Sequence, residues 1–179
     1  MEPRAGRTPR GVTLIESLTV MAVAAVLASA AAPSFERLLR TQRLAAAAGL
    51  LETDLHHARS LAVARQTALR MEWRQGAAGA CYVVHTGRAG DCRCEDGVET
   101  VCRPGVTALR SVRLAEPGGW SVRASAAAVS FDPVLGAVTP ATSVDLSDAQ
   151  GRGVRLVVNA MGRVRACSTG ETLSGWPSC

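Results

Sequence analysis

The sequence predicts an α+β chain in which a long N-terminal helix, transmembrane at first and then amphipathic, packs on a C-terminal β-rich head. Three observations predict it. An almost uncharged apolar stretch occupies residues 12–33, apolar residues recur at helical spacing over residues 34–66, and short alternating segments separated by turn residues fill residues 67–179. The length of 179 residues suits one globular domain with an appendage.

The apolar stretch is long enough to cross a membrane. Residues 12–32 read VTLIESLTVMAVAAVLASAAA and carry one charge, Glu16. At about 1.5 Å per residue they cover about 30 Å, the thickness of a bilayer core. A cleaved secretory signal peptide competes with this interpretation, because the small residues near position 30 would suit a signal peptidase. The early Glu16 and the direct continuation into a second helical pattern favour an anchor.

The segment GVTLIE, residues 11–16, resembles the class III signal of type IV pilins and type II secretion pseudopilins. The resemblance implies that residues 1–11 are a leader, that prepilin peptidase cuts between Gly11 and Val12, and that Val12 is then methylated. It also implies a single-pass protein of the bacterial inner membrane with its head in the periplasm, which later joins other pilins or pseudopilins in a filament. Val12 is a departure, since Phe or Met usually follows the cut.

Glu16 is the candidate assembly residue. A carboxylate inside hydrocarbon is costly and usually marks function. The resemblance implies that Glu16 pairs with the amine at Val12 of a neighbouring subunit, which sets the axial register of the filament. The alternative is an ordinary signal anchor that tolerates one acid near the interface. Pro33, which ends the apolar stretch, either bends the helix, as in many pilins, or breaks it at the membrane surface.

Residues 34–66 are predicted to form an amphipathic helix that lays one face on the head. The apolar positions of that face are Leu44, Ala47 or Ala48, Leu51, Leu55, Ala58 and Ala62. The neighbouring His56 and His57 point about 100° apart on a helix and cannot chelate one metal well, so a solvated or partly packed histidine pair is the favoured interpretation.

The head is predicted to be a pair of sheets or a sandwich built from short strands. Aromatic residues make up only 3% of the chain, so Leu, Val and Ala must form most of its core. The predicted strands cover residues 68–73, 81–85, 106–114, 120–124, 128–131, 143–147, 154–158 and 163–167.

Six cysteines lie in this head and are predicted to form disulfides, because the membrane-targeting N-terminus implies an oxidising compartment. They are Cys81, Cys92, Cys94, Cys102, Cys167 and Cys179. We pair Cys167 with Cys179 and leave the other connectivity open. The alternative for the cluster around residue 93 is a metal knuckle, but the usual two-residue spacing between ligands is missing, so no metal site is expected.

A second resemblance covers the C-terminal half. The segments FDPVLGAVTP, from residue 131, and GRGVRLVVNAMGRVRAC, residues 151–167, are similar to the GspH/FimT family of pseudopilins. Gly162, Arg163 and Arg165 match the GRxR motif of FimT-like minor pilins, which implies binding of double-stranded DNA. Arg163 and Arg165 share one face of a strand. Arg152 and Arg155, one hairpin away, are expected to extend the patch. The alternative is a solvated strand face.

Two functions follow from these resemblances. The first is a FimT-like minor pilin that aids pilus assembly and captures DNA through backbone contacts in natural transformation. The second is a GspH-type minor pseudopilin of a type II secretion system, with protein contacts only. The net charge of +5 permits an anionic partner without requiring one. An enzyme is not expected, because no nucleophile–base pair, paired acids or metal-ligand spacing stands out, and no cofactor is expected.

Overall fold

The structure is a computed structural model that describes residues 13–76, 79–94, 100–114, 120–170 and 173–179. Two compact units divide between Arg40 and Thr41. A single helix, α1 (Leu14–Arg65), contributes to both. The helix continues through Pro33, so the alternative interpretation of this proline as a helix break is wrong. Alanines flank Pro33 on its N-terminal side and are the strongest helix formers, which offsets the lost backbone donor.

The first unit consists, among the described residues, of the N-terminal part of α1. Thr13 caps it, because its Oγ1 accepts a hydrogen bond from the Glu16 amide at 3.3 Å. Every side chain of residues 14–40 is exposed, including large aliphatic ones such as Leu14, Ile15 and Met21. Within the described residues, α1 is the one helix that is long and apolar enough to cross a membrane.

The second unit is the head, and all its strand pairs are antiparallel. One sheet has the order β5 (Ala108–Arg113), β2 (Gly79–His85), β1 (Leu69–Gly76), β7 (Ala128–Phe131), β8 (Val138–Thr139). The other has the order β11 (Val164–Thr169), β10 (Gly153–Val158), β9 (Thr142–Asp148), β6 (Trp120–Ala124). A short ribbon joins β3 (Cys92–Arg93) to β4 (Val101–Cys102).

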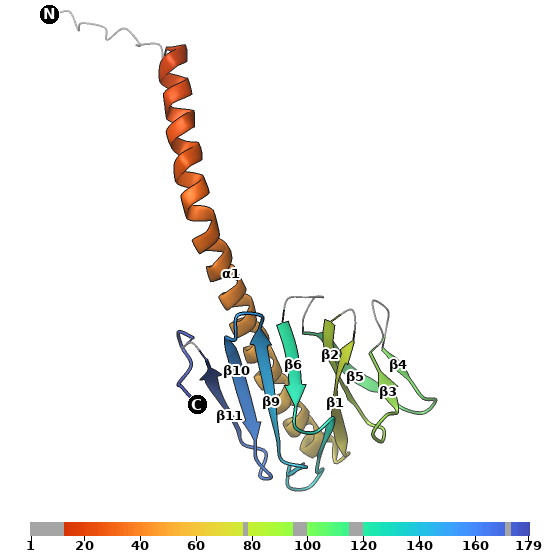
Figure 1. Ribbon diagram of the computed structural model, residues 1–179. Coiled ribbons are helices and arrows are strands. Elements are labelled where there is room, and N and C mark those ends of the chain that lie inside the picture. The colour runs from red at the N-terminus through yellow and green to blue at the C-terminus, as the bar shows by residue number, and fades with distance from the viewer. Residues whose placement is uncertain (1–12, 77–78, 95–99, 115–119, 171–172) are drawn as a thin grey trace, which may run out of the picture. The chain divides into compact units, whose positions relative to one another are not determined.

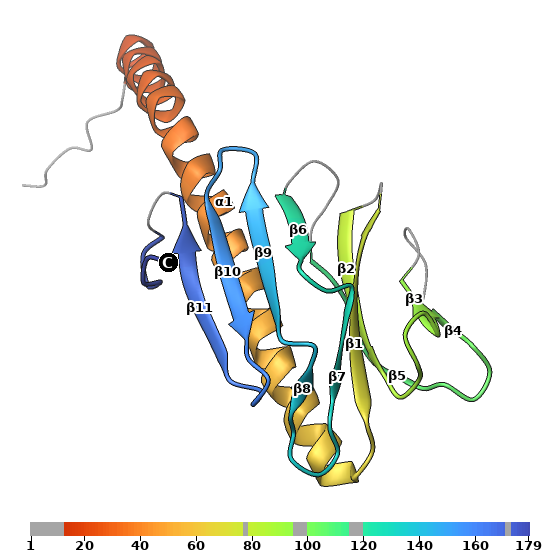
Figure 2. The same ribbon diagram turned by 60° about the horizontal axis from the view of Figure 1, so that its bottom comes forward.

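The two sheets lie side by side, and the C-terminal part of α1 runs behind them (Figures 1 and 2). The predicted pair of sheets is therefore present, but helix rather than a second sheet covers the inner faces, unlike in a sandwich. The predicted helix face is confirmed, because it is buried against core residues of both sheets. Its buried apolar members are Leu44, Ala48, Leu51, Leu55, Ala58 and Ala62.

The C-terminus of α1 is closed by backbone hydrogen bonds. The Thr67 amide donates to Ala62 O at 3.1 Å and the Gln66 amide donates to Val63 O at 3.2 Å, which is the Schellman pattern. Gln66 adopts the left-handed conformation this turn needs, with φ of 50°. The chain then enters β1 after a sharp reversal.

Three disulfides join all six cysteines: Cys81–Cys94, Cys92–Cys102 and Cys167–Cys179. The predicted pairing of Cys167 with Cys179 is confirmed. It holds the C-terminal tail against β11, where the Ser168 amide donates to Pro177 O at 2.7 Å and the Cys179 amide donates to Ser168 O at 3.1 Å. The tail therefore covers an edge strand that would otherwise offer unpaired backbone groups.

Candidate functional site

The turn between β10 and β11 holds the arginine motif. The Arg163 amide donates to Asn159 Oδ1 at 2.9 Å, and the Gly162 amide donates to Asn159 O at the same distance. Arg163 directly precedes β11 and Arg165 lies within it; both side chains are exposed. Val164 and Ala166, between and after them, pack against the core. The two arginines therefore share the outward face, and the apolar residues face the core.

Gly162 has a packing role besides its turn conformation. Its φ is +74°, and a Cβ there would lie 2.5 Å from Arg59 Nε and 2.7 Å from Gly136 O. Arg59, on α1, donates from Nε to that same Gly136 carbonyl at 2.8 Å. The glycine of the motif thus leaves room for an α1 side chain that ties the β7–β8 turn to the helix.

The outer face of the β11–β10–β9–β6 sheet is turned away from the C-terminal part of α1 (Figure 1). Most of the charged residues on this face are basic. Arg155 pairs in register with Asp145, which pairs on its other side with Arg123. These three residues alternate with buried ones such as Val122, Val144 and Leu146, so they share the outer face with Arg165. With Arg163 at the rim, this outer basic face carries four arginines and one carboxylate.

Asp145 holds Arg155 tightly. Nε and Nη2 of Arg155 donate to the two Asp145 oxygens at 2.6 and 3.2 Å, a bidentate pair. These hydrogen bonds and the charge of Asp145 raise the pKa of Arg155 above its ordinary value. Arg155 therefore lies on the predicted patch but is already paired. Arg163 and Arg165 have no ion pair within the part of the chain that the structure describes.

Arg152 does not extend the patch, and that expectation is wrong. Its side chain is only 6% exposed, and it pairs with Asp148 at 2.6 Å. Its Nη1 also donates to Thr41 Oγ1 on α1 at 3.1 Å. The register explains this position: Arg152 immediately precedes β10 and folds back onto Asp148 at the end of β9, inside the turn between the two strands. It joins the helix to this turn.

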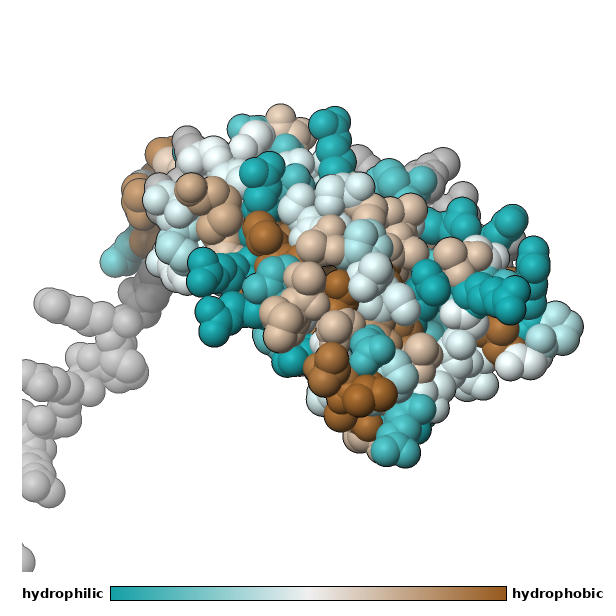
Figure 3. All heavy atoms as spheres, turned by 90° about the horizontal axis from the view of Figure 1, so that it is seen from below, coloured by the Kyte–Doolittle hydropathy of each residue, from teal (hydrophilic) through white to brown (hydrophobic). Residues whose placement is uncertain are grey.

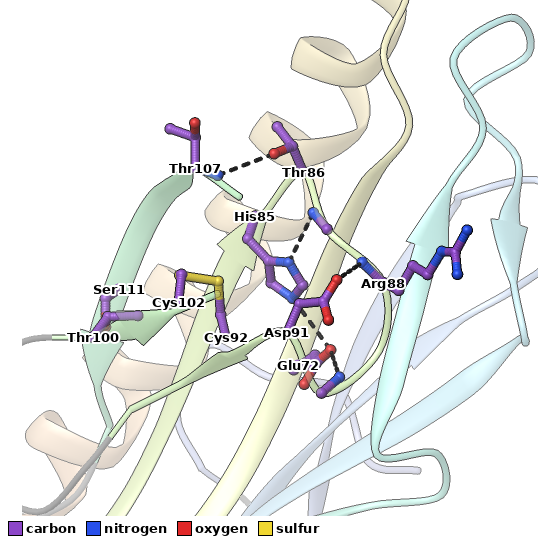
Figure 4. The surroundings of a disulfide bond; sticks show 12 residues. Glu72, His85, Thr86, Arg88, Asp91, Cys92, Thr100, Cys102, Thr107 and Ser111 are labelled. Carbon is purple, nitrogen blue, oxygen red and sulfur yellow. Dashed lines mark hydrogen bonds and ion pairs between the residues drawn. A yellow bond between two sulfur atoms is a disulfide. The ribbon is translucent and has the colours of Figure 1, made fainter. Parts of the chain in front are cut away.

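A buried polar pair supports the loop that carries β3. The Gly87 amide donates to Nδ1 of His85 at 3.1 Å, so Nδ1 carries no hydrogen and Nε2 donates to Glu72 Oε1 at 3.2 Å (Figure 4). Glu72 also accepts from the Gly90 amide at 2.7 Å. His85 Nδ1 and Glu72 Oε1 each accept a hydrogen bond from a backbone amide of the loop, which gives the pair a structural role.

A second polar cluster joins α1 to this same sheet, β5–β2–β1–β7–β8. The Tyr82 hydroxyl donates to Asp54 Oδ2, and Arg110 on β5 donates from Nε to the same oxygen. Burial and the neighbouring carboxylate raise the pKa of Tyr82 well above its ordinary value. His56 and His57, on the same helix, are both exposed, in line with the favoured interpretation. No group of three or more potential metal ligands is found among the described residues.

Comparison with known proteins decides the family. The family described as Type II transport protein GspH matches residues 47–162, and the prokaryotic N-terminal methylation motif matches residues 6–32. This chain belongs to the GspH family. It is a type IV pilin-like protein of the GspH/FimT group, with the helix-on-sheet head of that fold.

A solved structure agrees on the fold. The type IV minor pilin FimU of Pseudomonas aeruginosa (strain PAO1), in space group P21, superposes with a TM-score of 0.51 at 15% identity over 74% of this chain and 96% of FimU. A second crystal form, P65, gives 0.48 at 16% identity over 73% and 99%. A search of curated proteins finds no match.

The two family matches cover the predicted N-terminal site but not the predicted arginine pair. The methylation motif includes Gly11, Val12 and Glu16; Gly11 and Val12 lie outside the described residues, whereas Glu16 lies in the first turn of α1, near the favourable end of the helix dipole. The GspH match ends at Gly162 and does not include Arg163 or Arg165. Membership of the GspH family therefore gives no support for a role of Arg163 and Arg165. Any such role must be argued from their geometry.

Sequence reasoning missed Arg59, Arg123 and Asp145. Arg123 and Asp145 had a usable signal, because each is the charged member of an alternating apolar segment. Their meeting across β6 and β9 follows from the register, which no local pattern fixes. Arg59 had no such signal, since the two turns it contacts are far away in sequence.

Proposed function

We propose that this chain is a FimT-like minor subunit of a type IV pilus that aids pilus assembly and captures double-stranded DNA during natural transformation. The observation that carries the DNA part is the exposed pair of Arg163 and Arg165 on the outer basic face, with no carboxylate of the described chain bonded to either. The family and the apolar helix support the filament part.

The chemistry of the outer basic face favours phosphate over bases. Guanidinium groups bind phosphate oxygens through paired N–H donors, and such contacts carry no sequence information. The aromatic side chains Trp73, Tyr82 and Phe131 are buried in the core and cannot stack on bases. Binding is therefore expected to be independent of sequence and to weaken steeply with salt.

Assembly depends in this proposal on the N-terminal segment. Prepilin peptidase removes residues 1–11, the apolar part of α1 holds the subunit in the bacterial inner membrane with the head in the periplasm, and Glu16 pairs with the Val12 amine of a neighbouring pilin. The proposed roles are binding and assembly, with no catalytic step.

A DNA titration of residues 41–179 tests the DNA part. Electrophoretic retardation of duplex DNA should be visible at low salt and lost as salt rises. Replacing both arginines (Arg163→Gln with Arg165→Gln) should lower the slope of log affinity against log salt by about 2, since each lost phosphate contact removes about 0.9. The matched control, Arg88→Gln with Arg113→Gln, removes the same charge from exposed residues away from this face and should keep the slope.

Equal loss in both double variants would show that net charge alone attracts DNA. Unchanged binding after removal of Arg163 and Arg165 would refute DNA capture by this face. Either result leaves the filament part of the proposal standing, because that part concerns α1.

The second candidate is a minor pseudopilin of a type II secretion system. The GspH match favours it, because that family is described as a type II transport protein and its match ends before the arginine pair. In that case the outer basic face is a solvated surface, and residues 41–179 should show no retardation of DNA at any salt concentration.

A further inference from the structure

Large aliphatic side chains gather at the end of the head where α1 terminates. Val134 and Leu135, in the turn between β7 and β8, are 77% and 75% exposed, and Met161, in the turn between β10 and β11, is 73% exposed. Val63 on α1 is also exposed. Figure 3 looks onto this end and shows a hydrophobic group of side chains there. We name these four residues the apolar end patch.

The two turns of the apolar end patch are joined to each other and to the helix. The Val138 amide donates to Ala160 O at 2.8 Å, which links the end of one turn to the other. A Cβ at Gly136 would lie 3.2 Å from Val63 Cγ2, so the helix contacts the first turn directly. The apolar end patch is thus formed by three chain segments that contact one another.

The turn that carries Val134 and Leu135 is held in a fixed conformation. Asp132 Oδ1 accepts hydrogen bonds from the Val134 and Leu135 amides at 2.9 and 2.8 Å. The Gly136 amide donates to Asp132 O at 3.0 Å, and its carbonyl is bound by Arg59. A turn that is already ordered loses little conformational freedom on binding. Rigid display of two adjacent aliphatic side chains to water suits an interaction surface.

The rim of the apolar end patch is basic. Arg65, in the last turn of α1, and Arg163, beside Met161, are exposed, and neither is ion-paired within the described ranges. Asp132 Oδ1 accepts hydrogen bonds from the Leu135 and Val134 amides, and these hydrogen bonds lower the pKa of the carboxyl group, so it stays ionised. Its single negative charge is outnumbered by the two arginines, and the rim keeps a net positive charge. A second copy of this chain would bring the same basic rim, and like charges facing each other disfavour association.

We propose that the apolar end patch docks a different pilin-type subunit, one whose surface combines aliphatic side chains with carboxylates. This inference rests on the proposed membership of a filament but not on DNA capture. The aliphatic side chains supply the buried centre of the contact, and Arg65 and Arg163 meet the carboxylates at its rim.

Photo-crosslinking of the full chain in cells that assemble the filament tests this surface. A photoreactive residue replaces Met161 in one variant and Leu135 in another; a third carries it at Val101, which is exposed on β4 away from the apolar end patch. The first two should give an adduct whose peptides belong to a different chain with an N-terminal methylation motif. The third should not give this adduct.

Charge reversal sharpens the result. In the variant with the probe at residue 161, Arg65→Glu should reduce the yield of adduct by at least about tenfold, because a carboxylate would then face carboxylates. The matched reversal Arg113→Glu, on the exposed β5, should leave the yield unchanged.

An adduct with a second copy of this chain, with lipid, or no adduct at all would overturn the proposed surface. Recovery of the chain in sheared filaments, measured in the same cells, distinguishes failure of the proposed surface from failure of the proposed filament function. If the chain is present in filaments but gives no expected adduct, only the proposed surface is refuted. If the chain is absent from filaments, the proposed filament function is refuted as well.

Discussion

The two parts of α1 differ in whether their apolar side chains are buried. Residues 14–40 expose every side chain, although most are apolar, whereas residues 41–65 bury a regular face against two sheets. The helix supplies its own backbone hydrogen bonds in both parts, so only the side chains decide where each part is stable. In the proposed function the first part depends on lipid or on other subunits, whereas the second part packs on its own head. Substitutions should therefore affect assembly in one part and folding in the other.

The largest effect is expected for Glu16→Ala in the first part. If Glu16 pairs with the Val12 amine of a neighbour, its removal leaves that amine uncompensated in an apolar surrounding, and incorporation into filaments should be lost. Membrane insertion should continue, since alanine is more apolar than glutamate. The measurement is the amount of chain in sheared filaments relative to the amount in the membrane fraction.

The control for this variant is Glu36→Ala. Glu36 lies in the same part of α1 and pairs with Arg40 at 3.4 Å, with both side chains largely exposed. Such an exposed pair contributes only about 0.3–0.5 kcal/mol to the stability of the helix. Incorporation should remain normal, and normal incorporation of Glu16→Ala as well would refute the proposed role of Glu16.

The second prediction compares one leucine from each part. Leu51 is fully buried, so Leu51→Ala should lower the free energy of unfolding of the head by about 2–5 kcal/mol through lost burial and a cavity. Leu27 is 64% exposed, and Leu27→Ala should change the free energy of unfolding by less than about 0.5 kcal/mol. Denaturant unfolding of the full chain in detergent, followed by Trp fluorescence, measures both. Similar losses would contradict the division of α1 into two parts.

Periodic features of this chain were predictable from the sequence. The helix face from Leu44 to Ala62 and most of the longer strands follow from spacing alone, because burial on one side imposes a period on the side chains. The short β3, β4 and β8 were missed, since two residues cannot show a period. Helical continuity through Pro33 was predicted from the direct continuation of the apolar stretch into the amphipathic pattern, and the cost of one lost donor is small beside a long run of good helix formers.

The candidate site was only partly predictable. The shared face of Arg163 and Arg165 follows from strand geometry, but the fate of Arg152 depends on a turn that folds it back onto Asp148. The pairing of Arg155 with Asp145 depends on strand register. Contacts between residues distant in sequence have no local signature, so sequence reasoning identified the arginines without distinguishing free ones from paired ones.

A third prediction concerns the polar bond that fixes the second part of α1 to the sheet. Because the pKa of Tyr82 is raised in the fold, the folded chain keeps its phenol proton at a pH where the unfolded chain, with a pKa of about 10, loses it. The unfolded state then binds fewer protons, so stability should be constant below about pH 9 and fall above about pH 10. The slope should approach about 1.4 kcal/mol per pH unit.

Tyr82 is the only tyrosine, so tyrosinate absorbance reports on it alone. Native protein at about pH 11 should show almost no tyrosinate absorbance, and denatured protein at the same pH should show it in full. Tyr82→Phe should remove the alkaline slope of stability. Native tyrosinate near pH 10 would mean that the phenol is not held by Asp54.

The smallest effect is expected where the second part of α1 ends. Gln66 adopts a left-handed conformation that costs a residue with a Cβ about 1 kcal/mol, and its backbone closes the Schellman turn. Gln66→Gly removes that cost but gives the unfolded chain more freedom, so a net gain of about 0.5 kcal/mol in the free energy of unfolding is expected. Gln66→Ala keeps the Cβ and should change stability less.

A loss on Gln66→Gly, measured by denaturant unfolding, would show that the glutamine side chain stabilises the turn by more than its backbone conformation costs. Leu27 is 64% exposed, so a helix-interior glycine at this position, Leu27→Gly, should leave head stability unchanged.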